Sequence, residues 1–192
     1  MRAGKRVPDD IKLYLLDARS GIQNDQREML LRFADVGKKE RIQKRRFGQD
    51  DALLADSLRI FALWETFGLK PIEQRLAIAA HGKPFLAERK DIFFNYSHSD
   101  GLIFCAVAKR EVGVDIQKIK PYNARLAKRI CSEEELVQLE NSKTKDEALC
   151  RIWTKKEAAA KLYGTGIFRP HPDKGFYITK NYDDYILTLS WF

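Results

Sequence analysis

Residues 151–166 have the sequence RIWTKKEAAAKLYGTG, and we predict that they form most of a helix over residues 146–163. Trp153, Glu157 and Lys161 follow one another at intervals of four, so a helix places them along one side. This side carries an aromatic ring, a carboxylate and an ammonium group in succession. Two interpretations are open at this point: a solvated Glu157–Lys161 ion pair above a core tryptophan, or part of a functional site.

A second carboxylate lies upstream in an apolar segment. Asp115 interrupts the run VGVDI, which we predict to be a short buried strand. A buried carboxylate needs a polar partner or a metal ion, so Asp115 either caps neighbouring backbone or binds a ligand. A hard cation such as Mg²⁺ takes a few carboxylates together with phosphate and water oxygens. Asp115 and Glu157 are therefore a candidate pair of metal ligands, with Lys161 available to neutralise charge on a phosphate.

The remaining segments give clear strand and helix signals. Apolar runs predict strands at residues 11–16, 74–80, 92–97, 102–108, 112–116, 175–180 and 185–192. Helical spacing predicts helices at 25–36 and 50–67, a short basic helix within 119–130, and a helix that the capping box SEEE (132–135) opens and that ends near 140. The helix over 50–67 has a broad apolar face that includes Phe61 and Trp64. The segment HGKPFL (81–86) is expected to be a loop.

Composition sets limits on the class of protein. The chain has 192 residues, a 44% hydrophobic fraction and a formal net charge of +8, which favours polyanionic ligands or acidic partners. Three cysteines without CxxC spacing predict free thiols in a reducing compartment. No apolar run is long enough to span a membrane, and the first residues lack the apolar core of a signal peptide, so we expect a cytoplasmic protein.

Five motifs in succession carry a resemblance to a known family. They are GKPFL, FNYSHSDG, VGVDIQKIKP, AKRICSEEE and WTKKEAAAKLYGTGI. In this order and spacing the chain resembles, over roughly residues 38–167, the 4′-phosphopantetheinyl transferases of the surfactin-synthetase-activating type. The resemblance implies an α+β fold of two similar halves related by a pseudo-two-fold axis, each with a small antiparallel sheet packed on a long helix. We expect the halves at 1–108 and 109–192, with coenzyme A bound between them.

The resemblance also implies a reaction. Members of the family move 4′-phosphopantetheine from coenzyme A to a serine of an apo carrier protein and release adenosine 3′,5′-bisphosphate, with Mg²⁺ or Mn²⁺ as the metal. Asp115 and Glu157 would hold the metal together with the pyrophosphate of coenzyme A, and Glu157 would also act as the base for the carrier serine, either directly or through a metal-bound water. Lys161 would contact the transferring phosphate.

Further residues are carried over for substrate binding. The set expected to bind coenzyme A comprises Lys83 and Pro84 at the adenine and 3′-phosphate end, Ser97 and His98 in a phosphate-binding hairpin, and Lys44 and Arg46 in the basic segment that holds the 3′-phosphate in relatives. Many relatives have glutamate where this chain has Gln117. Because an amide is a neutral and weaker metal ligand, we expect Gln117 to act through water or not at all.

The excess of basic residues has a use under this interpretation. An acidic apo carrier protein of the acyl, polyketide or peptidyl type would be attracted to a basic surface. The candidate docking residues are Lys118, Lys120, Arg125, Lys128 and Arg129, with an ordinary basic surface as the alternative. Two other classes of protein are alternatives. The first is a nucleic-acid-binding protein, although the sequence has no evident aromatic-basic platform. The second is a relative that binds carrier proteins without catalysis. We expect a monomer that binds no nucleic acid and no membrane.

Overall fold

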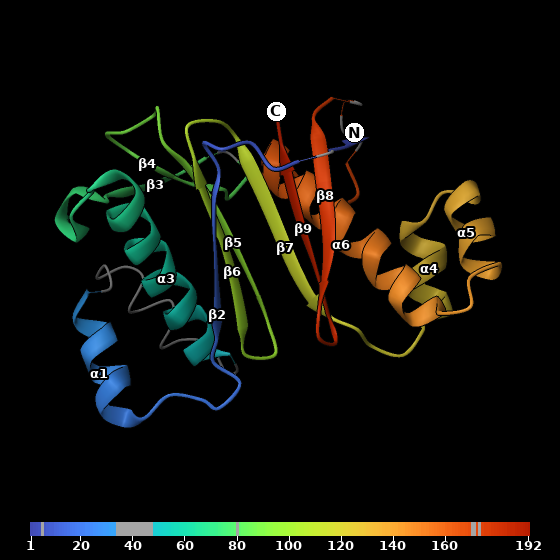
Figure 1. Cartoon of the computed structure of the whole chain (residues 1–192), viewed down its shortest axis with the longest axis horizontal. Coiled ribbons are helices and arrows are strands. Elements are labelled where there is room, and N and C mark those ends of the chain that lie inside the picture. The colour runs from blue at the N-terminus through green and yellow to red at the C-terminus, as the bar shows by residue number, and fades with distance from the viewer. Residues whose placement is uncertain (5, 34–47, 80, 170–171, 173) are drawn as a thin grey trace.

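The computed structural model describes residues 1–4, 6–33, 48–79, 81–169, 172 and 174–192. Two sheets hold most of the strands (Figure 1). One sheet has the order β2-β6-β5, from Lys12–Asp17, Leu102–Ala108 and Phe93–Ser99. The other has the order β1-β8-β9-β7, from Arg2–Ala3, Phe176–Tyr182, Tyr185–Trp191 and Val112–Lys118. A small hairpin joins β3 (Leu76–Ile78) to β4 (Pro84–Leu86).

The described part of the chain has five α-helices, and the two longest of them pack on the sheets. The helices are α1 (Asn24–Phe33), α3 (Gln49–Phe67), α4 (Ala124–Ile130), α5 (Glu133–Glu140) and α6 (Lys145–Tyr163), with a 3₁₀ turn, η1, at Pro71–Glu73. The long helix α3 packs on β5 and β6, and α6 packs on β7 and β9. Both end at a glycine with positive φ, Gly68 and Gly164, which a residue without Cβ adopts at little cost.

The same arrangement occurs twice along the chain. Each time, a strand is followed by a long helix and then by a hairpin, and the strand and the hairpin belong to one sheet. In the first set β2 lies beside β6, the second strand of the β5–β6 hairpin. In the second set β7 lies beside β9, the second strand of the β8–β9 hairpin. These pairs are all antiparallel. The predicted α+β class with small antiparallel sheets is therefore confirmed, while the pseudo-two-fold axis stays a prediction.

Strand β6 links the two cores. Its sequence LIFCAVA is apolar throughout and every residue is buried. Ile103, Cys105 and Val107 face α3 in the first core. Alternate residues such as Phe104 and Ala106 face the second core, which contains residues of β7 and β9. Because side chains alternate along a strand, β6 is buried on both faces and holds the two sheets together.

Several predicted details are wrong in the structure. The segment 81–86 is not only a loop, because β4 pairs with β3 there. Strand β3 covers only three residues of the predicted 74–80, and Gln74 instead bonds to Arg59. Phe61 and Trp64 are 46% and 53% exposed, because the sheet covers only one side of α3. The helix predicted over 25–36, in contrast, is confirmed from Asn24 to Phe33, and residues 34–36 lie outside the described residues.

Other predictions are confirmed. The capping box between Ser132 and Glu135 opens α5. Cys105, Cys131 and Cys150 are free thiols, the first and last of them buried. Within the described part of the chain, no helix combines the length and apolar character needed to cross a membrane.

Candidate active site at the junction of the two sheets

Strand β7 brings Asp115 under helix α6. The close approach of α6 depends on Gly113, because a Cβ at that position would lie 2.2 Å from Ala158 O and 2.4 Å from Leu162 N. Asp115 is two residues further along β7 and lies on the same face. Its side chain is therefore enclosed by α6 above and by β5 beside it, and Asp115 is only 5% exposed.

Two side chains from two other elements, Lys161 of α6 and Ser97 of β5, meet at this carboxylate. Lys161 Nζ lies 2.7 Å from Asp115 Oδ1 and donates to Ser97 Oγ at 2.8 Å. Ser97 Oγ in turn donates to Asp115 Oδ1 at 2.7 Å. The second oxygen, Asp115 Oδ2, is buried and has no hydrogen-bond partner among the described residues. Burial raises the pKa of Asp115, although Lys161 and Ser97 oppose that rise.

Glu157 is the second carboxylate of the site. It lies one helical turn before Lys161 and is half-buried. Burial raises its pKa, the negative charge of Asp115 raises it further, and Lys161 opposes both effects. The lysine therefore pairs with Asp115 across the junction, and the solvated Glu157–Lys161 pair that the sequence left open is wrong.

The donor set fits a hard divalent cation. Asp115 and Glu157 can carry two negative charges and Lys161 only one positive charge, so the lysine does not neutralise both. Among the described residues, Asp115 Oδ2 also has no hydrogen-bond partner. Within the described ranges, no group of three or more His, Cys, Asp or Glu side chains could hold a metal. A cation at Asp115 and Glu157 would therefore take its remaining ligands from a substrate or from water.

A cavity of about 250 Å³ opens beside this site. It lies between the β3–β4 turn, strand β5 and the end of α6, and its wall includes Lys83, Pro84, Asn95, Tyr96, Lys161 and Thr165. Lys161 connects the cavity to Asp115, because its side chain lines the one and bonds the other. Lys83 pairs with Glu111 and donates to Leu162 O at 3.0 Å, so its ammonium group closes the last turn of α6.

The other residues predicted to bind substrate lie apart. Ser97 faces Asp115, whereas His98 points to the opposite side of β5, where its Nδ1 lies 3.6 Å from Asp51 Oδ2 at the start of α3. Lys44 and Arg46 lie outside the described residues. The structure thus brings Lys83 and Pro84 to the cavity and Ser97 to the carboxylate, and it separates His98 from both.

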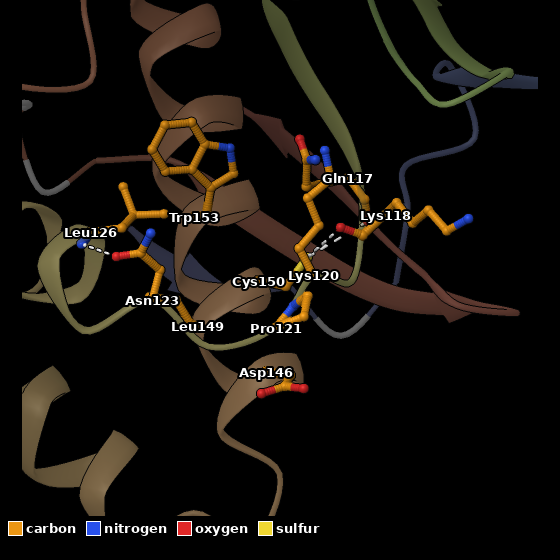
Figure 2. A pocket seen from close by; sticks show the side chains of 10 residues that line it. All are labelled: Gln117, Lys118, Lys120, Pro121, Asn123, Leu126, Asp146, Leu149, Cys150 and Trp153. Atoms are coloured by element: carbon orange, nitrogen blue, oxygen red, sulfur yellow. Dashed lines mark hydrogen bonds between the residues drawn. The ribbon is translucent and has the colours of Figure 1, made fainter.

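A second cavity of about 270 Å³ lies nearer the start of α6, beside Leu149, Cys150 and Trp153 (Figure 2). Gln117 lies in its wall, two residues beyond Asp115 on β7, together with Trp153 and Cys150 of α6. Trp153 is half-buried: it packs against the core cluster of Ala127, Ile130, Leu139 and Leu149, and it also lines the cavity. Along α6, residues 149–153 line the second cavity, Glu157 follows, and residues 160–161 line the first cavity.

Several residues that hold this site were not among the predicted ones. Asn95 and Ser99 flank Ser97 on the same face of β5, and both bond to β7. Glu111 is the partner of Lys83. A signal for the first pair was present, since Asn95, Ser97 and Ser99 alternate through a strand that is otherwise largely apolar or aromatic. Glu111 had no comparable signal, because its role depends on how the two sheets meet.

Comparisons with known proteins identify the class. A family model described as the 4′-phosphopantetheinyl transferase superfamily matches residues 111–186. A 4′-phosphopantetheinyl transferase of Bacillus subtilis is 33% identical over 143 residues, 71% of this chain and 64% of that protein. The 4′-phosphopantetheinyl transferase Sfp of Bacillus subtilis strain 168 is 30% identical over 166 residues, 83% of this chain and 73% of Sfp. The chain therefore belongs to the 4′-phosphopantetheinyl transferase superfamily.

A more particular assignment follows within this class. The similarity to Sfp confirms the resemblance to the surfactin-synthetase-activating type. A further relative, the 4′-phosphopantetheinyl transferase HetI of Nostoc sp. strain PCC 7120, is 35% identical over 108 residues, 52% of this chain and 46% of HetI. The chain spans less than two thirds of the first relative named above and more than two thirds of Sfp.

Proposed function

We propose that this protein transfers the 4′-phosphopantetheine group of coenzyme A to a serine of an apo carrier protein and releases adenosine 3′,5′-bisphosphate. The observation that carries the proposal is the convergence of Asp115, Glu157 and Lys161 beside a cavity. Membership of the superfamily gives this arrangement its chemistry, since the curated relatives are named for the same transfer.

The roles of the side chains follow from their charges. Asp115 and Glu157 would hold Mg²⁺ or Mn²⁺, which supplies charge neutralisation for the pyrophosphate of coenzyme A when it is bound. Lys161 has three N–H groups and uses two on Asp115 and Ser97, which leaves one for a phosphate oxygen. The raised pKa of Glu157 suits a general base, because a carboxylate with a higher pKa accepts a proton more readily near neutral pH.

The proposed transfer is a displacement at phosphorus, in which one P–O bond forms and another breaks. The serine oxygen forms a bond to the phosphorus that carries the pantetheine arm, and the bond from this phosphorus to the adenosine bisphosphate oxygen breaks. Glu157 takes the serine proton, and Lys161 donates a hydrogen bond to the transferring phosphate. Positioning and electrostatic stabilisation supply most of the rate in such reactions.

Coenzyme A would lie between the halves 1–108 and 109–192. The cavity beside Lys83 and Pro84 suits the nucleotide end, because it lies at the end of α6 with Lys161 between it and Asp115. Gln117 faces the second cavity, and we propose no direct metal bond for it. His98, Lys44 and Arg46 remain proposed contacts of the phosphates, and Ser97 bonds Asp115.

The acidic carrier protein would approach the second cavity. Leu126, Leu149 and Trp153 give this cavity an apolar wall, and Lys118 and Lys120 lie at it (Figure 2). Three of the five predicted docking residues have partners within the chain: Lys118 pairs with Asp184, Lys120 pairs with Asp100, and Arg129 stacks on Phe168. The other two, Arg125 and Lys128, are exposed on α4. We propose these two as the main docking cations.

Mass spectrometry of carrier proteins tests the proposal. The protein is incubated with coenzyme A, MgCl2 and apo carriers of the fatty-acid, polyketide and peptide-synthetase types. We expect a serine-bearing peptide of at least one carrier to gain the mass of the phosphopantetheine group, and we expect chelation of the metal to prevent it. If Sfp modifies every carrier in parallel reactions and this protein modifies none, the proposal is wrong.

A further inference from the structure

Among the described residues, the two sheets pack together, but no strand-to-strand backbone hydrogen bonding joins them into one sheet. Strand β7 is the edge strand of the β1-β8-β9-β7 sheet. On the side away from β9 it packs on β5 and β6 of the other sheet. An edge strand has a row of N–H groups that no strand pairs, and burying such groups without partners is costly. The buried edge of β7 therefore needs acceptors from outside its own sheet.

Side chains of β5 supply these acceptors. Val114 N donates to Asn95 Oδ1 at 2.9 Å, and Lys118 N donates to Ser99 Oγ at 3.1 Å. Asn95 and Ser99 are each 7% exposed, so water does not readily replace them. Val114 and Lys118 are four residues apart along β7, and their acceptors Asn95 and Ser99 are also four residues apart, on one face of β5.

Asp115 lies between these two bonds. Ser97 is the middle member of the β5 row and bonds Asp115 Oδ1. The row Asn95, Ser97 and Ser99 therefore contacts β7 at three successive points. We call these three residues the β5 polar row. The outer two members accept hydrogen bonds from the backbone of β7, and the middle member bonds the carboxylate.

We propose that Asn95 and Ser99 are positioning residues: by accepting the edge N–H groups of Val114 and Lys118, they fix Asp115 against Ser97 and Lys161. A lost acceptor would leave a buried N–H unpaired and would let β7 shift along or away from β5. The carboxylate at the centre of the row would then lose its fixed distance to Glu157. The consequence for metal binding rests on the proposed function, whereas the fixing of β7 does not.

The test uses matched variants. Ser99→Ala removes the acceptor and Ser99→Thr keeps a hydroxyl. Asn95→Ala removes the other acceptor. Ser57→Ala is the control, because the Ser57 hydroxyl bonds Leu53 O within α3, away from the junction. If Asn95→Ala does not fold, the Ser99 pair alone decides.

The first measurement is amide hydrogen exchange by NMR in the metal-free protein. We expect Ser99→Ala to accelerate exchange at Lys118 by about fivefold or more relative to amides of α3, as the loss of one hydrogen bond implies. Asn95→Ala should do the same at Val114. Ser99→Thr and Ser57→Ala should leave both amides unchanged. Unchanged exchange at Lys118 in Ser99→Ala would overturn the proposal, whatever the protein's activity.

The second measurement is Mn²⁺ affinity in the presence of coenzyme A, by electron paramagnetic resonance. Loss of groups that orient metal ligands commonly costs about 10–100-fold in affinity, so we expect at least about tenfold for Ser99→Ala and Asn95→Ala. Ser99→Thr and Ser57→Ala should stay within about twofold of the wild type. If exchange accelerates and Mn²⁺ affinity does not fall, the positioning role is wrong. If the wild type itself binds no Mn²⁺, the proposed function fails, and hydrogen exchange still decides whether the row fixes β7.

Discussion

Lys161 Nζ lies 2.7 Å from Asp115 Oδ1, and this pair ties helix α6 to strand β7 at the junction of the two sheets. The carboxylate is 7% exposed and the lysine side chain 28%. Removing one member of a buried pair leaves an uncompensated charge, which costs more than the pair itself contributes. The ion pair therefore makes the two residues interdependent in stability as well as in any reaction at the site.

We expect Lys161→Met to destabilise the metal-free protein by about 1–3 kcal/mol near neutral pH, below the roughly 3–5 kcal/mol of fully buried pairs because the lysine is partly exposed. Urea unfolding measures this change. Asp115→Asn in the Lys161→Met background should restore part of the loss, since the amide carries no charge. Additive effects of the two substitutions would contradict the interdependence.

Glu157 should matter for the reaction more than for folding. Glu157→Gln removes the proposed base, and we expect kcat for carrier modification to fall by about 10²–10⁴-fold. The melting temperature should stay the same or rise, because burial and Asp115 both disfavour the charge of Glu157. Glu133→Gln, at an exposed position of α5, is the matched control and should change neither quantity. A Glu157→Gln protein with wild-type kcat would exclude the base role.

The raised pKa values of Asp115 and Glu157 predict how stability depends on pH. Their ordinary values are 3.8 and 4.5, and both are raised in the folded protein. Their stabilising contribution is therefore complete below the ordinary values and is lost as pH rises through the raised ones. Mg²⁺ needs both carboxylates ionised, so the increase in Tm caused by MgCl2 should grow with pH over the same interval.

Calorimetric melting at several pH values, with and without MgCl2, checks this prediction. The double variant Asp115→Asn/Glu157→Gln should lose both the increase in Tm and its pH dependence. An increase in Tm that is equally large below pH 4 would mean that Mg²⁺ binds elsewhere.

Gly113 should be the least replaceable residue of β7. The Cβ of Gly113→Ala would overlap backbone atoms of α6, Ala158 O at 2.2 Å and Leu162 N at 2.4 Å, so the helix would have to move. Overpacking of this kind costs about 1–3 kcal/mol and occasionally more. Gly166→Ala is the control, because its Cβ would meet no atom within 4 Å. Equal urea midpoints for the two variants would show that α6 has room above β7.

The sequence predicted the long periodic elements well and the contacts between them poorly. Helices α3 and α6 and both hairpins were predictable because their periodicity and turn residues are local signals. The pairing of Ser97 with Asp115 was not, because it depends on how two sheets dock. Phe61 and Trp64 illustrate the same limit: spacing shows that they share a helix face, but not that the sheet leaves it exposed.

The sequence predicted which residues form the site, but not which of them bond to one another. Asp115, Glu157 and Lys161 were singled out by an acid in an apolar strand and by spacing along a helix. Neither signal indicates that Lys161 would pair with Asp115 in preference to Glu157, four residues away on its own helix. The burial of Asp115 decides this, because the more deeply buried carboxylate has the greater need of a counter-charge.

Charge reversal on α4 tests the docking surface. Arg125→Glu/Lys128→Glu should raise KM for an acidic carrier protein by about tenfold or more at low salt, because rim charges chiefly set the rate of encounter. KM for coenzyme A should stay unchanged, since neither residue lies at the cavity beside Lys83. The difference between variant and wild type should shrink as salt rises, because exposed charges are screened.

Lys180→Glu and Lys174→Glu, both exposed positions outside α4, together make the same change in net charge and should leave KM for the carrier within about twofold of wild type. Equal effects of the two double variants would mean that overall charge, and not this surface, attracts the carrier.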